Sequence, residues 1–103
     1  MPYLTDNERS KARHRARKIR MDAAREKGRH TKNEWEALKA EFNGVCVKCV
    51  GASGLANVEK DHIVPVFAGG SDSIDNIQPL CARCNCGKMD SFDWKTYRRG
   101  GGL

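Results

Sequence analysis

Apolar residues recur at helical spacing through the first third of the chain. Ala12, Ala16, Ile19 and Ala23 follow one another at intervals of four, three and four residues, which predicts a helix with a thin apolar stripe. A stripe made mostly of alanine stabilises an isolated helix little. We therefore expect residues 1–30 to form a helical or partly disordered arm that orders against a partner or against the rest of the chain.

A second helix is predicted over residues 32–42. Thr31 and Glu34 form a T-x-x-E capping box, and an Asn-Gly pair after the helix supplies the stop signal. The large apolar side chains of this segment lie on one helical face, and they are Trp35, Leu38 and Phe42. We expect this face to pack against the core of the protein.

Residues 58–66 alternate in the manner of a β-strand. A regular strand turns successive side chains to opposite faces, so the neighbours Asp61 and His62 point apart. Joint use of both side chains at one site requires a bulge or an irregular strand end at this point.

A short strand and a helix are expected after a glycine turn. The turn spans residues 67–72, and the second strand lies near Ile77–Leu80. Residues 81–89 then enter a helix, which places Asn85 and Lys88 one turn apart on one face.

The chain is predicted to close with a terminal helix over residues 91–97. Ser91 is the expected cap, and Phe92 and Trp94 are expected to pack inward. The glycine-rich residues 98–103 are expected to form a flexible tail. The predicted organisation is thus an arm over 1–30, a folded domain over 31–97 and this tail.

Two Cys-x-x-Cys pairs, Cys46/Cys49 and Cys81/Cys84, are separated by 31 residues. Four thiolates in two such turns match a closed tetrahedral Zn²⁺ site, and a chain of 103 residues with 39% hydrophobic content needs such a staple. Disulfides are the alternative staple. No apolar leader follows Met1, which favours reduced thiols in the cytoplasm. Cys86 is expected to be an uninvolved buried or half-buried thiol.

The net charge of +6 is concentrated in the arm. Residues 9–32 contain eleven Lys and Arg against two acids, whereas the rest of the chain is formally −3. Attraction to a polyanion should therefore depend on the arm and on any bound divalent cation. The alternative is that the charge run only keeps the protein soluble. No apolar run is long enough to span a membrane.

The residues between and beside the cysteine pairs suit catalysis with a second metal. Asp61 and Asn85 offer hard oxygen ligands for Mg²⁺ or Mn²⁺. A neutral His62 near pH 7 is suited to take a proton from water, and Asn76 is placed to hold the loop or orient the imidazole. Each residue alone also has a structural explanation, as a strand-end acid, a turn former or a surface amide.

The motif as a whole resembles the HNH endonuclease family. The resemblance covers residues 46–88 and rests on Asp-His-Ile-Val-Pro at 61–65, Gly-Gly at 69–70, Asp-Asn-Ile-Gln-Pro-Leu-Cys at 75–81, Cys-Asn at 84–85 and Lys88. It implies a small α+β protein with a ββα-metal (His-Me finger) core. It also implies His62 as general base, Asp61 and Asn85 as catalytic metal ligands, Asn76 as the middle asparagine and the four cysteines as a zinc site. Asparagine stands where the family name has its last histidine.

The function expected from this resemblance is hydrolysis of DNA phosphodiester bonds, leaving 5′-phosphate and 3′-hydroxyl ends. The expected DNA contacts come from the arm and the second knuckle, through Arg13, Arg15, Arg17, Lys18, Arg20, Arg83 and Lys88. Small phage HNH proteins suggest a packaging terminase or a second copy as partner, in the cytoplasm of a bacterial host. The alternative is a non-catalytic zinc-ribbon module that binds nucleic acid or protein. A secreted, disulfide-stapled domain is a more distant alternative.

Overall fold

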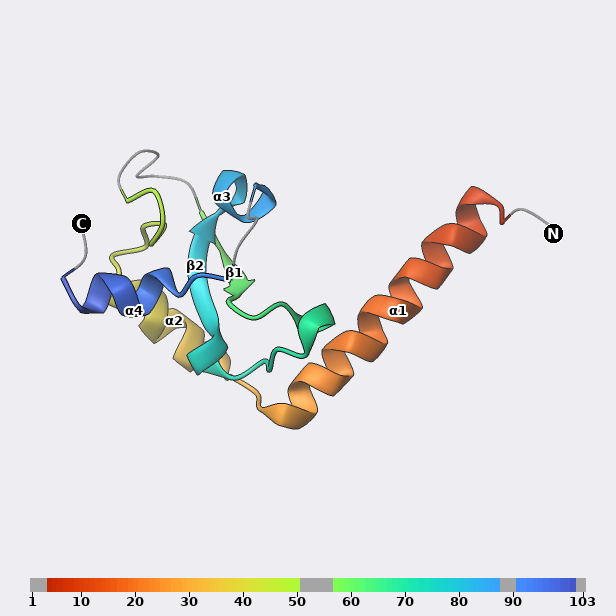
Figure 1. The fold of residues 1–103 in the computed structure, drawn as a ribbon, viewed down its shortest axis with the longest axis horizontal. Coiled ribbons are helices and arrows are strands. Elements are labelled where there is room, and N and C mark those ends of the chain that lie inside the picture. Colours follow the sequence, from red (N-terminus) through yellow and green to blue (C-terminus); the bar gives the residue numbers. More distant parts are fainter. Residues whose placement is uncertain (1–3, 51–56, 88–90, 102–103) are drawn as a thin grey trace.

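A two-stranded antiparallel sheet lies at the centre of the computed structural model, which describes residues 4–50, 57–87 and 91–101 (Figure 1). Strand β1 (Val58–His62) pairs with β2 (Ile77–Cys81) in an unbroken register that sets Val58 opposite Cys81 and His62 opposite Ile77. Two 3₁₀ turns, η1 (Val66–Ala68) and η2 (Ile74–Asn76), lie in the connection between the strands. Helix α3 (Ala82–Cys86) follows β2 directly.

The core consists of two small clusters that meet at the sheet. Helix α2 (Lys32–Glu41) buries Trp35 and Leu38 against Ile77, and Phe42 packs against this cluster. The second cluster joins the first cysteine turn to β2, through Cys46, Val47, Leu80 and Cys81. The capping box at Thr31 is formed, with the Glu34 backbone N–H donating to its hydroxyl over 3.0 Å. The predicted inward face of this helix is confirmed.

A buried glutamine links both strands to the last helix, α4 (Trp94–Arg99). The Gln78 side chain is fully buried, and its Nε2 donates to Oδ2 of Asp61 over 2.9 Å and to the carbonyl of Phe92 over 3.1 Å. Its Oε1 accepts from the backbone N–H of Trp94 over 2.8 Å. One side chain therefore satisfies polar groups from β1 and from the start of α4 inside the protein.

Helix α1 (Asp6–Lys27) extends away from this module (Figure 1), and the longest dimension of the molecule is 54 Å. Thr5 caps the helix by accepting from the Glu8 backbone N–H. Ala24 is the buried residue of this helix, whereas Ile19 of the expected apolar stripe is 69% exposed. The expected helix is present, but the alanine stripe is not its docking face. No helix in the described ranges is both long and apolar enough to cross a lipid bilayer.

Several element boundaries differ from the sequence prediction. The first strand ends at His62 rather than at residue 66. The chain turns at Val64, because the Asn76 side chain accepts a hydrogen bond from the Val64 backbone N–H. The final helix is capped by Asp93 rather than Ser91, since the Asp93 carboxylate accepts from the Thr96 backbone N–H over 2.9 Å. It continues past the predicted end at residue 97, as far as Arg99. The helix predicted over 81–89 is observed as α3, which begins at Ala82 and ends at Cys86, while residues 88–89 lie outside the described residues.

The burial of Gln78 generates a stability prediction. Replacement of Gln78 by leucine keeps the volume but leaves the Asp61 carboxylate and the Trp94 backbone N–H without this partner in a buried place. We expect a loss of roughly 2–4 kcal/mol in the free energy of unfolding, measured by urea denaturation. Glu36→Leu, on the half-exposed surface of α2, is the control and should change the free energy by less than about 0.5 kcal/mol. Equal losses in the two variants would contradict this role.

Candidate active site

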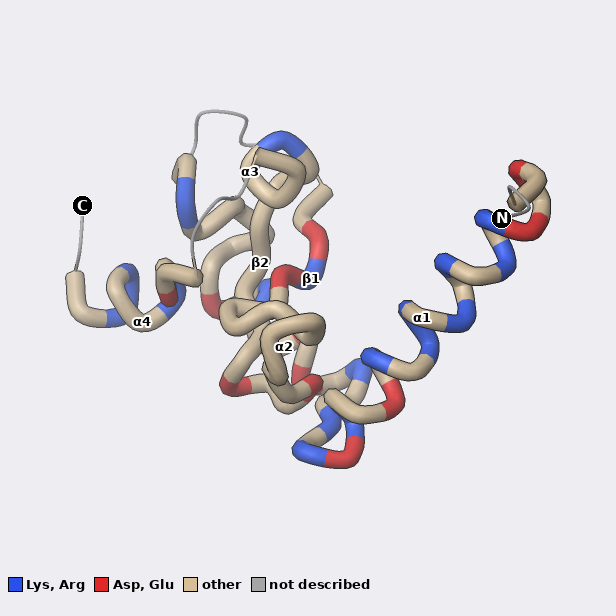
Figure 2. Tube along the Cα trace, turned by 45° about the vertical axis from the view of Figure 1, so that its right-hand side comes forward, with Lys and Arg blue, Asp and Glu red and all other residues tan. Residues whose placement is uncertain are grey.

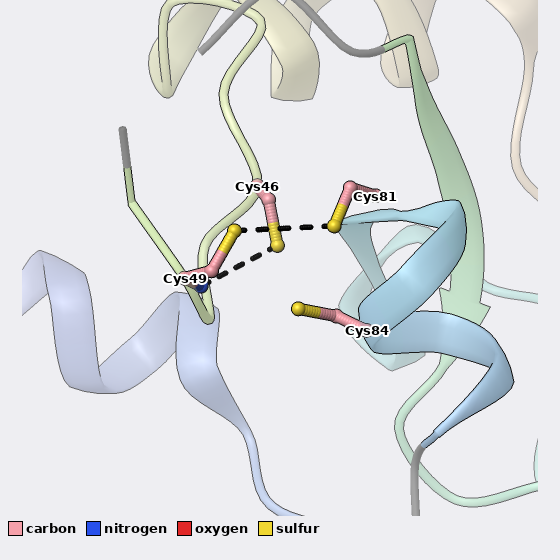
Figure 3. A group of neighbouring side chains, drawn as sticks. All are labelled: Cys46, Cys49, Cys81 and Cys84. Atoms are coloured by element: carbon pink, nitrogen blue, oxygen red, sulfur yellow. Dashed lines mark hydrogen bonds between the residues drawn. The ribbon is translucent and has the colours of Figure 1, made fainter. Parts of the chain in front are cut away.

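The four cysteines of the two Cys-x-x-Cys pairs converge between the turn after α2, the end of β2 and α3 (Figure 3). All four Sγ atoms lie within 4.8 Å of one another, and those of Cys49 and Cys81 are 3.9 Å apart. Four thiolates on a tetrahedral Zn²⁺, each about 2.3 Å from the ion, lie about 3.8 Å from one another. The arrangement therefore fits a closed tetrahedral metal site. Cys86 lies outside the cluster and is exposed, so the expectation of a buried or half-buried thiol is wrong.

The cysteine cluster is also electrostatically suited to a cation. The hydrogen bond from the Cys84 backbone lowers the pKa of the Cys81 thiol, which favours the thiolate form of this sulfur. Burial beside the other three sulfurs raises the pKa of Cys84 to about 12. A divalent cation would replace the proton held by such a cluster, because metal binding to cysteines releases protons.

Asp61 and His62 end strand β1 on opposite faces, as the two-residue period requires. Asp61 is 5% exposed and accepts its hydrogen bond from Gln78, directly across the sheet. The pairing register is unbroken as far as His62, so the strand contains no bulge between these two residues. The chain leaves the sheet only after His62, so the bulge or irregular end expected at these two residues is not found.

His62 contacts an acid that the sequence analysis did not single out. Its Nε2 lies 2.8 Å from Oδ1 of Asp72, whose side chain is only 10% exposed. Asp72 also accepts from Nδ1 of His30 through its backbone carbonyl, over 2.7 Å. In the sequence, Asp72 could have been noticed as the acid that ends the predicted glycine turn.

Asn76 holds the loop that follows His62. Its Oδ1 accepts from the Val64 backbone N–H over 2.9 Å, and its Nδ2 donates to the carbonyls of Val64 over 3.0 Å and Ser71 over 2.8 Å. All three hydrogen bonds cross the connection between β1 and β2. The amide thus turns the chain out of the sheet directly after the histidine.

Asn85 reaches β1 from helix α3. Its Nδ2 donates to Oε1 of Glu59 over 3.0 Å. Glu59 and Asp61 share one face of β1, about 6.7 Å apart along the strand. The Asn85 contact therefore brings α3 to the strand face that carries Asp61, and it uses the amide nitrogen rather than the amide oxygen. Arg83 is exposed on α3, while Lys88 lies outside the described residues.

Three comparisons with known proteins bear on the family of this chain. A family model described as HNH endonuclease matches residues 46–99, which include both cysteine pairs, both strands and α3. The chain belongs to the HNH endonuclease family. A probable HNH endonuclease of Lactococcus phage SK1 is 33% identical over 96 residues, covering 84% of this chain and 96% of that protein. No solved structure matches the chain. The HNH resemblance and the nuclease class are confirmed.

The HNH match begins at Cys46 and so leaves helix α1 outside it. Lys and Arg residues occur along the whole length of this helix (Figure 2). The five arm residues selected from the sequence are all exposed on it, and they are Arg13, Arg15, Arg17, Lys18 and Arg20. The HNH protein therefore carries nine of its 19 Lys and Arg residues on one helix that lies outside the matched region.

The tight loop after His62 generates a prediction at Gly70. A Cβ added there would lie 1.8 Å from the Val64 carbonyl oxygen and 2.9 Å from Nδ2 of Asn76. Gly70→Ala must displace the loop, and we expect thermal unfolding to show a loss of roughly 1–3 kcal/mol in stability. Gly100→Ala is the control, because its Cβ would meet other atoms only at 3.6 Å. Identical melting temperatures for the two variants would show that the loop after His62 accepts the added Cβ without loss of stability.

Proposed function

We propose that this protein is a metal-dependent nuclease that hydrolyses DNA phosphodiester bonds, with His62 as general base. The observation that carries the proposal is the position of His62 at the end of β1, with its ring held by Asp72 and the following loop held by Asn76. A general base must be kept in a fixed orientation toward the proton it removes. Membership of the HNH endonuclease family supports the same assignment.

The chemical step is a hydrolysis with one proton acceptor. The neutral imidazole of His62 takes a proton from a water molecule, and the water oxygen forms a bond to phosphorus. The bond between phosphorus and the 3′ oxygen breaks, and the leaving oxygen takes a proton from solvent. The products are a 5′-phosphate and a 3′-hydroxyl. Asn76 contributes by fixing the backbone just after the base.

Asp61 and Asn85 are the residues that would hold the catalytic cation. A carboxylate and an amide oxygen are hard donors that suit Mg²⁺ or Mn²⁺. The hydrogen bonds from Gln78 to Asp61 and from Asn85 to Glu59 orient both side chains without using the oxygen of the Asn85 amide. A cation bound there would supply Lewis acidity at the scissile phosphate.

The four clustered cysteines support a structural Zn²⁺ as the second metal. A site filled by four protein thiolates keeps no open position for a substrate, so its role is to hold the fold. We propose that residues 31–97 form the zinc-stapled HNH ββα domain, with residues 1–30 as the DNA-binding arm. Arg83 and Lys88 are proposed to contact the DNA backbone beside the site.

The relative from Lactococcus phage SK1 supports a role in phage DNA processing, within an infected host cell. One chain carries one such site, so a double-strand break needs two nicks, a second copy or another nuclease. We keep as a prediction that the partner of this protein is a terminase subunit or a second copy of this chain.

The role of His62 predicts the outcome of a nicking assay. Zinc-loaded protein should nick supercoiled plasmid with Mg²⁺ or Mn²⁺, and His62→Ala should lower the rate by about 10²–10⁴-fold, because general bases contribute that much. DNA affinity should not change. His14→Ala, at an exposed histidine on α1, is the control and should keep its nicking rate. Normal cutting by His62→Ala would refute the assigned base, and no cutting by the native protein would favour the non-catalytic zinc-ribbon module.

The cysteine cluster predicts a contrast between two neighbouring thiols. Native protein and Cys86→Ser should each contain one Zn²⁺ per chain in native mass spectrometry, because Cys86 is outside the cluster. Cys84→Ser should lose the ion and unfold at a lower temperature, since structural zinc is worth roughly 10 kcal/mol or more to small domains. Full zinc content in Cys84→Ser would exclude the four-thiolate site.

A further inference from the structure

Helix α1 is fixed to the HNH module at its C-terminal end. The Asp72 backbone N–H donates to the carbonyls of both Ala24 and Gly28 at 3.1 Å, and Nζ of Lys27 donates to the Gly69 carbonyl over 2.6 Å. Ala24 itself is 2% exposed. These contacts set the rotation of the helix about its own axis. The face that carries Ala24 is therefore the face turned toward the module.

The same face carries a row of arginines along the rest of the helix. With 3.6 residues per turn, Arg20, Arg17 and Arg13 lie within about 40° of the direction of Ala24. Lys11, Arg15 and Lys18 lie about 120° or more from it. Lys18 is also paired with Asp22 over 3.1 Å, which reduces the charge that the far face offers. These two sets of three cations thus point in different directions from the helix axis.

The arginine row begins beside the candidate active site and leads away from it. Asp72 touches both the base of α1 and His62, so the anchored end of the helix lies next to the histidine. From there the helix and the module diverge (Figure 1). Seven residues separate Arg20 from Arg13, a rise of about 10 Å, which equals about three steps of 3.4 Å along the axis of a DNA duplex.

We propose that Arg13, Arg17 and Arg20 bind the backbone phosphates of double-stranded DNA that flanks the scissile phosphate, whereas Lys11, Arg15 and Lys18 face solvent. This inference rests on the proposed nuclease function and names its substrate as a duplex. Guanidinium groups match phosphate oxygens in a bidentate way. Single-stranded DNA is the poorer occupant, because its binding sites use aromatic stacking and α1 contains no Phe, Tyr or Trp.

Two charge-matched triple variants test the proposal. Both are made in the full, zinc-loaded His62→Ala protein, and their binding to a labelled 30-base-pair duplex is measured between 50 and 300 mM salt. Arg13→Gln/Arg17→Gln/Arg20→Gln should reduce the slope of log K against log salt by about 2–3, since each phosphate contact contributes about 0.9. Lys11→Gln/Arg15→Gln/Lys18→Gln should reduce it by less than about 1. Both triples remove the same charge and keep good helix formers.

Equal effects of the two triples, or tighter binding to a single strand than to the duplex, would overturn the proposal. The readout is binding by a variant that lacks the assigned base, so it does not depend on cleavage. If the two triples differ in DNA binding but the native protein does not nick DNA, this inference is kept and the nuclease function is rejected. If the native protein nicks DNA but the two triples bind alike, the nuclease function is kept and this inference is rejected.

A second inference comes from the contact between His62 and Asp72. A carboxylate oxygen accepts hydrogen bonds, so a 2.8 Å contact to Nε2 assigns the proton of a neutral imidazole to Nε2 and its lone pair to Nδ1. The Asp72 carboxylate is held in turn by Nε of Arg25 at 3.8 Å, and its Oδ1 lies 3.6 Å from Nδ1 of His30. We infer that Asp72 is a positioning residue that selects Nδ1 of His62 as the proton acceptor.

Asp72→Asn tests this role, because it keeps the backbone contacts of residue 72 to α1 and His30. We expect kcat to fall about 10–100-fold with KM unchanged, and the ¹⁵N imidazole shifts of His62 to report loss of the Nε2–H tautomer. Asp75→Asn, at an exposed acid of the same connection, is the matched control and should change neither. An unaltered tautomer or an unaltered kcat in Asp72→Asn would reject the assignment.

Discussion

The meeting of the two cysteine pairs is the contact on which the rest of the module depends. It joins a turn after α2 to the end of β2 and the first turn of α3, in a protein whose two hydrophobic clusters are small. Cys81 is the last residue of β2 and Cys84 lies within α3, so the cluster fixes the angle at which the helix leaves the sheet. Because Asn85 follows Cys84 directly, the place of a candidate catalytic ligand is set by a contact that takes no part in the chemistry.

Buried polar side chains supplement this small core. Gln78 connects β1, β2 and the start of α4, and Lys95 donates to the carbonyls of Ile74 and Asp75 just before β2. Burial lowers the pKa of Lys95, so the folded state tolerates the charged form less readily than water does. Directional hydrogen bonds therefore fix the ends of the strands where apolar contacts are few. This matters at His62, because the candidate active site lies at the end of β1.

Local signals in the sequence predicted the features that depend on local chemistry. The capping box at Thr31, the second strand and the grouping of the cysteines follow from spacing and residue type, and the HNH motif could be recognised from residues 46–88. Contacts between segments that are distant in the chain could not be predicted from the sequence. In the sequence, Asp72 is only an acid in a loop, and its importance appears when the structure places the end of α1 beside it. Ala24 is likewise one alanine among several, and only the structure shows that its carbonyl accepts a hydrogen bond from that loop. The strand end at His62 likewise depends on Asn76, which is 14 residues away in the chain.

The attachment of α1 through Ala24 also affects how the sequence of such a protein can evolve. A helix of 22 residues with one buried position tolerates substitution along nearly its whole length without loss of folding. The cysteine turns and the histidine strand, by contrast, are held by contacts with several other elements. Mutation can thus alter what the helix touches while the hydrolytic apparatus stays constant, and related chains are expected to diverge fastest in their first thirty residues.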